Sequence, residues 1–211
     1  VIVGVGGSAT TDGGLGAVEA LGSPTRLAGV DVVVACDVRT GFLEAARVFA
    51  PQKGASPAQV EFLARRLDQL ADRYRREFGV DVTATPRTGA AGGLAGGLHA
   101  MGARLVDGFE VVADAVGLAD EIEAADLVLT GEGFLDAESF AGKVVGGVLD
   151  LSSRAGVATV AVVGQVFDGA DTDLRVIALA DRVGQATAMA DPTAAHEESV
   201  FELVKSESTG L

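Results

Sequence analysis

A glycine loop, Gly4–Gly14, follows the apolar run Val1–Val5 and precedes a helical pattern over Leu15–Leu21. Glycines let the backbone approach an anion closely, and a helix N-terminus adds N–H donors and the positive end of a dipole. The hydroxyls and the carboxylate of this loop suit a polyol or a magnesium-bound phosphate. We therefore predict ligand contacts from Gly6, Gly7, Ser8 and Thr10, with Asp12 as a catalytic or magnesium-binding residue.

Other interpretations of the loop stay open. Asp12 or Thr11 could simply cap the helix that follows. The spacing Gly4-x-Gly6-x-x-Ala9 also matches the alanine form of the dinucleotide-binding fingerprint, with the acidic Asp37 after the next predicted strand. No Walker A lysine follows, so the loop is not a P-loop.

Two lysines stand beside glycines in two further motifs. The chain has three lysines against thirteen arginines, and Lys53 and Lys143 close or follow glycine-containing stretches. A compact ammonium suits a phosphate that is bound as a point charge. We predict that Lys53, with its neighbour Gln52, binds substrate or phosphate and that Lys143 is catalytic.

Acidic residues follow the predicted strand Leu127–Thr130, and open α/β sheets place ligands beyond the carboxyl ends of their strands. We predict that Asp136 is catalytic or binds magnesium, although such residues also cap helices. Asp37 is predicted to bind an acceptor hydroxyl, with a simple turn as the alternative. The predicted binding residues after Leu127–Thr130 are Gly131, Glu132, Gly133 and Ser139.

Elements that would position these residues alternate along the chain as strand and helix patterns, which indicates an α/β fold with parallel strands. The clearest helix is Pro57–Phe78, with an apolar face and the capping pattern Ser56-Pro57-Ala58-Gln59. The predicted parallel strands are Val1–Val5, Val30–Cys36, Leu127–Thr130, Ala158–Val163 and Arg175–Ala180.

Other segments are less regular. Gly89–Met101 predicts a helix of small residues with another backbone packed tightly against it. Val80–Thr88 and Arg104–Val116 predict strands of a smaller mixed sheet. Asp191–Leu211 predicts a final helix, with Val200, Leu203 and Val204 facing inward.

Charge and composition exclude several classes of partner. The net charge is −14 and no basic stripe interrupts it, which argues against nucleic acid. No apolar run approaches the ~18 residues of a membrane span. Cys36 is the only cysteine, in an apolar run, and predicts a small buried thiol in a reducing, cytoplasmic compartment. Neither His99 nor His196 has partners at zinc-ligand spacing.

Several motifs follow one another along the chain: Gly6–Gly14, Ala35–Val38, Pro51–Ala55, Gly89–Leu94, and Leu129–Gly133 with Gly142-Lys143. Taken together, they resemble the motifs of type I glycerate kinases in their order along the chain. The resemblance implies phosphoryl transfer from ATP, with Mg²⁺, to a hydroxyl of glycerate, giving 2- or 3-phosphoglycerate. It also implies a Rossmann-like parallel-sheet domain and a smaller inserted α/β domain with a mixed sheet, with the ligand site between them.

On this basis we expect residues 1–125 to form the inserted glycine-rich domain and residues 126–211 the C-terminal part of the Rossmann-like domain. The family's N-terminal part is then absent. We therefore also expect an uncovered apolar surface, self-association through that surface, and an isolated chain that is inactive.

The chain also departs from the family's pattern. Thr11 stands where asparagine is usual, Phe134 where arginine is usual and Glu138 where glutamine is usual, and Arg39–Ala50 replaces a longer segment. Two alternatives therefore stay open beside the kinase: a non-catalytic relative or binding module, and a fragment of an NAD-dependent oxidoreductase.

Overall fold

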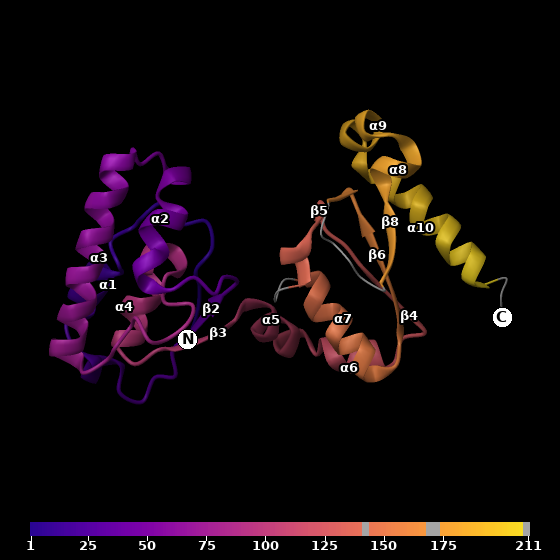
Figure 1. The fold of residues 1–211 in the computed structure, drawn as a ribbon. Coiled ribbons are helices and arrows are strands. Elements are labelled where there is room, and N and C mark those ends of the chain that lie inside the picture. Colours follow the sequence, from indigo (N-terminus) through magenta and orange to yellow (C-terminus); the bar gives the residue numbers. More distant parts are fainter. Residues whose placement is uncertain (141–143, 168–173, 209–211) are drawn as a thin grey trace. The chain divides into compact units, whose positions relative to one another are not determined.

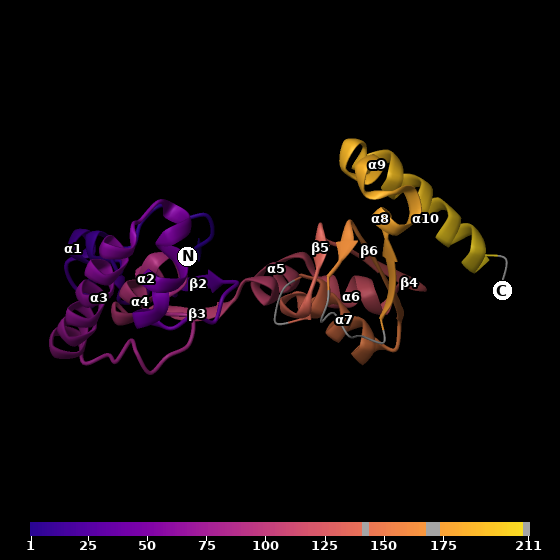
Figure 2. The same ribbon diagram turned by 45° about the horizontal axis from the view of Figure 1, so that its top comes forward.

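The computed structural model describes residues 1–140, 144–167 and 174–208. It divides into two compact units, Val1–Val111 and Val112–Leu211, each combining helices with a small parallel sheet (Figures 1 and 2). The predicted α/β class is thereby confirmed. The assignment of an inserted domain and a Rossmann-like part, divided near residue 125, stays a prediction.

The sheet of the first unit has the order β1-β2-β3 and all its strands are parallel. Along β2 the side chains of Val34 and Cys36 are fully buried whereas Val33 and Ala35 are half-buried, because successive side chains point to opposite faces. The buried face packs against Ala95 and Leu98 of a glycine-rich helix. The strands are β1 (Ile2–Gly4), β2 (Val33–Cys36) and β3 (Arg104–Asp107), and that helix is α4 (Leu94–Ala100).

Helix α3 (Pro57–Phe78) organises the helical core of the first unit. It begins at a capping box, in which the Ser56 hydroxyl accepts from the Gln59 amide and the Gln59 side chain accepts from the Ser56 amide. Its buried face includes Leu67 and Tyr74, so the predicted helix is confirmed in both bounds and orientation. The other helices of this unit are α1 (Leu15–Leu21) and α2 (Ala45–Phe49), with 3₁₀ turns at Pro24–Leu27, Phe42–Glu44, Pro51–Lys53 and Ala90–Gly93.

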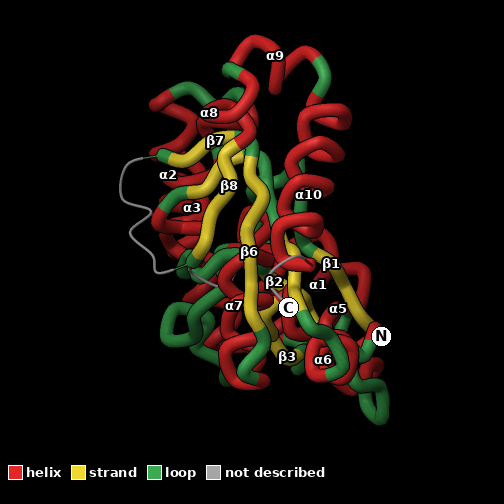
Figure 3. The backbone as a smooth tube through the Cα atoms, turned by 90° about the vertical axis from the view of Figure 1, so that its right-hand side faces the viewer, coloured by secondary structure: helices red, strands yellow, loops and turns green. Residues whose placement is uncertain are grey.

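The second unit has a parallel sheet of order β4-β6-β8, with helices on both faces (Figure 3). Val160 and Val162 of β6 join one core cluster with Leu203 of α10, while Ala161 and Val163 join another with Val145 of α7. A strand buried on both faces reads as the continuous apolar run seen in the sequence.

In the second unit two helices precede β4, helix α7 lies between β4 and β6 along the chain, and three helices follow β8; β5 and β7 form a separate short parallel pair. Helix α5 (Gly108–Val116) crosses the boundary between the units. The strands are β4 (Leu127–Thr130), β5 (Phe134–Leu135), β6 (Ala158–Val163), β7 (Gln165–Val166) and β8 (Arg175–Ala178); the helices are α6 (Leu118–Glu123), α7 (Val144–Ala155), α8 (Leu179–Val183), α9 (Gln185–Ala190) and α10 (Pro192–Ser208), with a 3₁₀ turn at Ala137–Phe140.

The prediction of a mixed sheet was wrong, since every strand pair in the described residues is parallel. Val80–Thr88 contains no strand: Asp81 binds Thr83 and Thr88 binds the Thr85 carbonyl in local turns that compete with a ladder. Arg104–Val116 is a strand only as far as Asp107.

Two smaller predictions also fail. After β3 the chain turns into α5, because the Asp107 carboxylate accepts a hydrogen bond from the Phe109 amide and so caps the helix. In α10, Leu203 is buried but Val204 is 46% exposed, so Val204 does not face inward.

None of the helices formed by the described residues is both long and apolar enough to span a membrane. Val1 and Ile2, at the edge strand β1, are largely exposed. Self-association through such apolar surfaces stays a prediction.

Candidate functional site

The loop between β1 and α1 is tied to Lys53, far away along the chain. The lysine Nζ donates to Ser8 Oγ at 2.9 Å and to the Thr10 carbonyl at 2.6 Å. Lys53 ends the 3₁₀ turn Pro51–Lys53, and Gly54 then takes a left-handed conformation before α3 begins. The structure thus brings together two motifs that the sequence predicted separately as ligand-binding.

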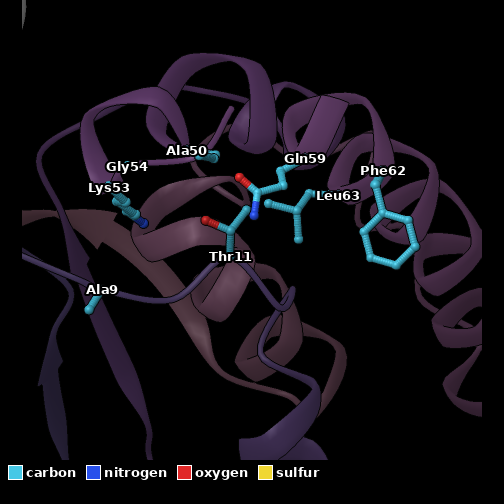
Figure 4. Close-up of a pocket in the computed structure, with 9 residues that line it drawn as sticks. Ala9, Thr11, Ala50, Lys53, Gly54, Gln59, Phe62 and Leu63 are labelled. Atoms are coloured by element: carbon cyan, nitrogen blue, oxygen red, sulfur yellow. The ribbon is translucent and has the colours of Figure 1, made fainter. Parts of the chain in front are cut away.

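A pocket of about 440 Å³ opens beside this contact. Figure 4 shows the Lys53 amine directed toward the loop that carries Ala9 and Thr11, with Gln59 and Leu63 of α3 also lining the pocket. The volume suits a small organic ligand. The polar groups at its wall are an ammonium, a hydroxyl and an amide, which can bind carboxylate and hydroxyl groups.

Lys53 keeps capacity for a ligand. An ammonium has three donors, and within the described part of the chain two of them are used, by Ser8 and Thr10. Partial burial lowers the pKa of Lys53, because desolvation disfavours its charged form. An anion entering the pocket would replace part of the lost hydration.

Asp12 caps the start of α1. Its Oδ1 accepts from the Gly14 amide at 3.0 Å and its Oδ2 from the Gly16 amide at 3.1 Å. The N-cap residue itself is Gly14, but the Asp12 carboxylate satisfies two amides at the start of the helix, in line with the capping alternative that the sequence left open. A catalytic or magnesium-binding role for Asp12 stays a prediction.

The glycine loop rests directly on the backbone of the Gly89–Gly97 segment, as the small-residue pattern predicted. A Cβ on Gly92, whose φ is +66°, would lie 2.0 Å from the Thr10 carbonyl oxygen. The Gly13 amide donates to the Gly92 carbonyl at 3.0 Å, and the buried Tyr74 hydroxyl donates to the Gly13 carbonyl at 3.0 Å. Burial raises the pKa of Tyr74. Backbone contacts therefore fix the loop.

The remaining predicted residues of this loop lie toward solvent. Gly6 and Gly7 are exposed, and a Cβ on either would meet no atom within 4 Å. Gln52 is exposed beside Lys53. These three positions therefore leave room for a ligand, and their binding roles stay predictions.

A second polar group lies at the carboxyl ends of β2 and β3. Asp37 follows β2 and is exposed, and its Oδ1 would lie 2.2 Å from a Cβ on Gly108. Arg87 donates to the Cys36 carbonyl and to Asp107 Oδ2, both at 2.9 Å. The pair of Arg87 and Asp107 is largely buried, and Arg87 takes a positive φ of 75°.

Sequence reasoning missed this pair. Asp107-Gly108-Phe109-Glu110 carries the signal of a helix cap followed by an acidic residue three positions later, which would have placed α5. Nothing local in the sequence points to Arg87 as its partner. Cys36 was predicted as a buried thiol, and this is confirmed: burial raises its pKa to about 11.

In the second unit, Gly131, Glu132 and Gly133 follow β4 and line a pocket of about 700 Å³. A Cβ on Gly131 would lie 2.2 Å from the Val162 carbonyl oxygen, so this glycine permits close approach of β4 and β6. Gly133 has open space around it. The sequence prediction of a ligand site at this strand end thus falls on a concave surface.

Asp136 and Ser139 form a reciprocal capping arrangement at the 3₁₀ turn Ala137–Phe140. The Ser139 amide donates to Asp136 Oδ1 at 3.0 Å, and the Asp136 amide donates to the Ser139 hydroxyl at 3.0 Å. Ser139 is fully buried. This again matches the capping alternative, while the catalytic role of Asp136 and the binding role of Ser139 stay predictions. Lys143 lies outside the described residues.

The described residues contain no cluster of three or more His, Cys, Asp or Glu side chains that could hold a metal ion. His99 is held by contacts to the Ala103 carbonyl and the Thr85 hydroxyl. The dinucleotide fingerprint also lacks its usual context, because α1 begins only at Leu15 and not at the Gly6–Ala9 turn.

Comparison with known proteins places most of the chain in one family. The sequence profile of the Glycerate kinase family matches residues 23–206, which leaves the first glycine loop outside the matched range. A protein of Salmonella typhimurium LT2 assigned as glycerate kinase 2, known from its crystal structure, aligns with a TM-score of 0.64 and 30% identity. That alignment covers 95% of this chain and 64% of the other.

Several relatives align over most of this chain. Glycerate 2-kinase of Escherichia coli is 36% identical over 200 residues, covering 80% of this chain and 52% of the relative. Glycerate kinase of Halalkalibacterium halodurans is 34% identical over 201 residues, with shares of 80% and 53%. An uncharacterized protein of Mycobacterium bovis is 41% identical over 173 residues, with shares of 79% and 45%.

The chain spans about half the length of the curated relatives it matches. The profile match nevertheless covers most of its residues, and the structural alignment covers nearly all of them. On these grounds the chain belongs to the glycerate kinase family.

Proposed function

We propose that this chain takes part in ATP-dependent phosphorylation of glycerate to 2- or 3-phosphoglycerate, and that the Lys53 pocket binds the hydroxy acid. The observation that carries the proposal is the Lys53 ammonium held between Ser8 and Thr10 with a donor left for an anion. Family membership supports the reaction class. The buried free thiol of Cys36 supports a reducing, cytoplasmic location.

The pocket offers complementary groups for a small hydroxy acid. The Lys53 ammonium would bind the carboxylate, and the Thr11 hydroxyl and Gln59 amide would bind hydroxyl groups of the same molecule. Phosphoryl transfer depends mainly on positioning and charge neutralisation, so a rigid loop is an advantage. The backbone contacts of Gly13 and Gly92 supply that rigidity.

Magnesium is part of the proposal as the ion that accompanies ATP and neutralises charge on its phosphates. Mg²⁺ bound to a nucleotide needs only one or two protein carboxylates, so a dedicated cluster is not required. Asp12 and Asp136 are the candidates. Each has at least one carboxylate oxygen bonded to a backbone amide, which orients the group.

The test is a coupled assay of ADP formation by the chain with MgATP and glycerate, run beside calorimetric titrations of each ligand. The proposal expects ADP formation that depends on glycerate, which is the opposite of the sequence-based expectation that the isolated chain is inactive. Binding of both ligands without turnover would favour a binding module or non-catalytic relative instead. Micromolar binding of NAD without measurable binding of ATP would favour the oxidoreductase.

A further inference from the structure

The carboxylate of Glu132 contains a buried oxygen without a hydrogen-bond partner. Among the described residues, Glu132 Oε1 is the one side-chain polar atom that is shielded from solvent and accepts no hydrogen bond. A desolvated carboxylate oxygen without a donor is costly, commonly by more than a neutral group. Glu132 lines the pocket of about 700 Å³ in the second unit.

The backbone around Glu132 is fixed, so the unpaired oxygen is not the result of a loose loop. The Glu132 carbonyl accepts from the Gly164 amide at 3.1 Å, and the Gly133 carbonyl accepts from the Gln165 amide at 3.1 Å. A Cβ on Gly164 would lie 2.4 Å from the Gly133 carbonyl oxygen. The loop after β4 is therefore held against the end of β6. Rotation about the terminal side-chain torsion, which is broad for glutamate, can still turn the carboxylate toward a donor.

The lining of this pocket favours an uncharged, partly apolar ligand that carries hydroxyl groups. Leu129, Val162 and Leu179 provide apolar wall, and Thr130 and Thr193 provide hydroxyls. Among the described lining residues there is no lysine or arginine, while Glu132 and Glu197 are acidic. Such a wall does not suit a triphosphate. It suits a base and a sugar, because a carboxylate accepts hydrogen bonds from hydroxyl groups.

The position in the fold agrees with this chemistry. The pocket lies beyond the carboxyl ends of the parallel strands β4 and β6, where open α/β sheets bind ligands. An acidic residue at such an edge can bind the hydroxyls of a ribose. A metal ion is the weaker interpretation, since no three-carboxylate or histidine cluster exists among the described residues.

We propose that the pocket of the second unit binds the nucleoside part of the phosphoryl donor, with the Glu132 carboxylate accepting a hydrogen bond from a ribose hydroxyl. This assignment rests on the proposed function for the identity of the donor. It differs from the sequence-based expectation, in which Glu132 binds substrate or phosphate and no particular group of the ligand is named.

The test compares the binding of ATP, 2′,3′-dideoxy-ATP and inorganic tripolyphosphate to the whole chain by calorimetry. We expect ATP to bind about 10- to 100-fold more tightly than the dideoxy nucleotide, as for loss of a hydrogen bond to a charged group. In Glu132→Gln that ratio should fall to about threefold or less, because an amide oxygen is a weaker acceptor than a carboxylate. Binding of tripolyphosphate should be unchanged or slightly tighter.

A matched control and a mapping experiment separate this site from general effects. Glu123→Gln removes an exposed carboxylate from α6 and should leave the ratio unchanged. In amide NMR spectra, ATP should shift the signals of Gly131, Gly133 and Gly164. Unfolding of the Glu132→Gln variant would be evident in the same spectra; Glu132→Asp, which retracts the carboxylate, should then give the same loss of ratio.

Three results would overturn the proposal: equal binding of ATP and its dideoxy analogue, no ATP binding at millimolar concentration, or shifts confined to Gly6–Gly14. The outcome is separable from that of the proposed function. Ribose-dependent ATP binding without glycerate phosphorylation would retain the pocket assignment and reject the reaction. Glycerate phosphorylation that uses ATP and 2′,3′-dideoxy-ATP equally well would retain the reaction and reject the pocket assignment.

Discussion

Replacing Lys53 by methionine should weaken glycerate binding strongly and should also lower the stability of the fold, by a smaller free energy. The ammonium forms two hydrogen bonds within the chain, to Ser8 and Thr10, and offers its third donor to the ligand. A hydrogen bond between charged groups contributes about 1.5 to 3 kcal/mol, so the Kd for glycerate should rise about 10- to 150-fold. Loss of the two internal bonds, at a partly exposed site, should lower the free energy of unfolding by about 1 to 2 kcal/mol.

The assay is calorimetric titration with glycerate, together with urea unfolding of the same protein samples. Arg65→Met is the matched control, because it removes one positive charge from the exposed face of α3. Ser8→Ala is the second comparison: it removes one partner but keeps the ammonium, so the Kd should change by less than about fivefold. Lys53→Arg should also bind poorly, since a planar fork replaces a compact group.

The reasoning is refuted if Lys53→Met binds glycerate with the wild-type Kd. It is also refuted if Arg65→Met loses as much affinity as Lys53→Met, because the effect would then reflect net charge and not the pocket. In either case Lys53 is a structural residue that fastens the glycine loop.

Three further predictions concern packing, protonation and catalysis. Gly92→Ala should lower the free energy of unfolding in urea by at least about 3 kcal/mol, because its Cβ would clash with the Thr10 carbonyl, whereas Gly102→Ala, which meets no atom within 4 Å, should cost about 1 to 2 kcal/mol. Burial raises the pKa of Cys36 from 9.0 to about 11, so the thiol ionises at a lower pH in the unfolded chain than in the folded one. The free energy of unfolding should therefore fall by about 1 to 2 kcal/mol between pH 9 and pH 11, and by less in Cys36→Ala. From the sequence alone, Lys143→Met should lower kcat about 100-fold with little change in Tm, and an unchanged kcat in the coupled assay would reject that role.

Local signals explain which elements could be predicted from the sequence. The capping box at Ser56 and the apolar repeat of α3 are both contained in one segment, and the predicted helix Pro57–Phe78 matches the structure. The strands β4 and β6 were also predicted with their bounds, because short, mainly apolar runs are typical of strands in parallel sheets. The strand prediction for Val80–Thr88 was wrong because its β-type residues form turns. Val82 is buried against residues of the helical core that are distant in the sequence.

Long-range contacts explain what could not be predicted about the site. Ser8 and Lys53 were both predicted to bind ligand. They lie 45 positions apart in the sequence, and no local periodicity could show that their side chains form a hydrogen bond with each other. Arg87 and Asp107 meet only because β2 and β3 end side by side and the turn before Ala90 brings the guanidinium to that edge. The capping bonds of Asp12 and Asp136 were foreseen as alternatives, because capping is again local.

The central claim is that this chain acts in phosphorylation of glycerate, and detection of the product tests it most directly. ³¹P NMR of the chain with MgATP and glycerate should show ADP together with a new phosphomonoester signal that is absent when glycerate is omitted. The coupling of that signal to the glycerate protons identifies the 2- or the 3-phosphate. Only ADP and inorganic phosphate, or unchanged ATP under conditions where calorimetry shows both ligands bound, would contradict the account.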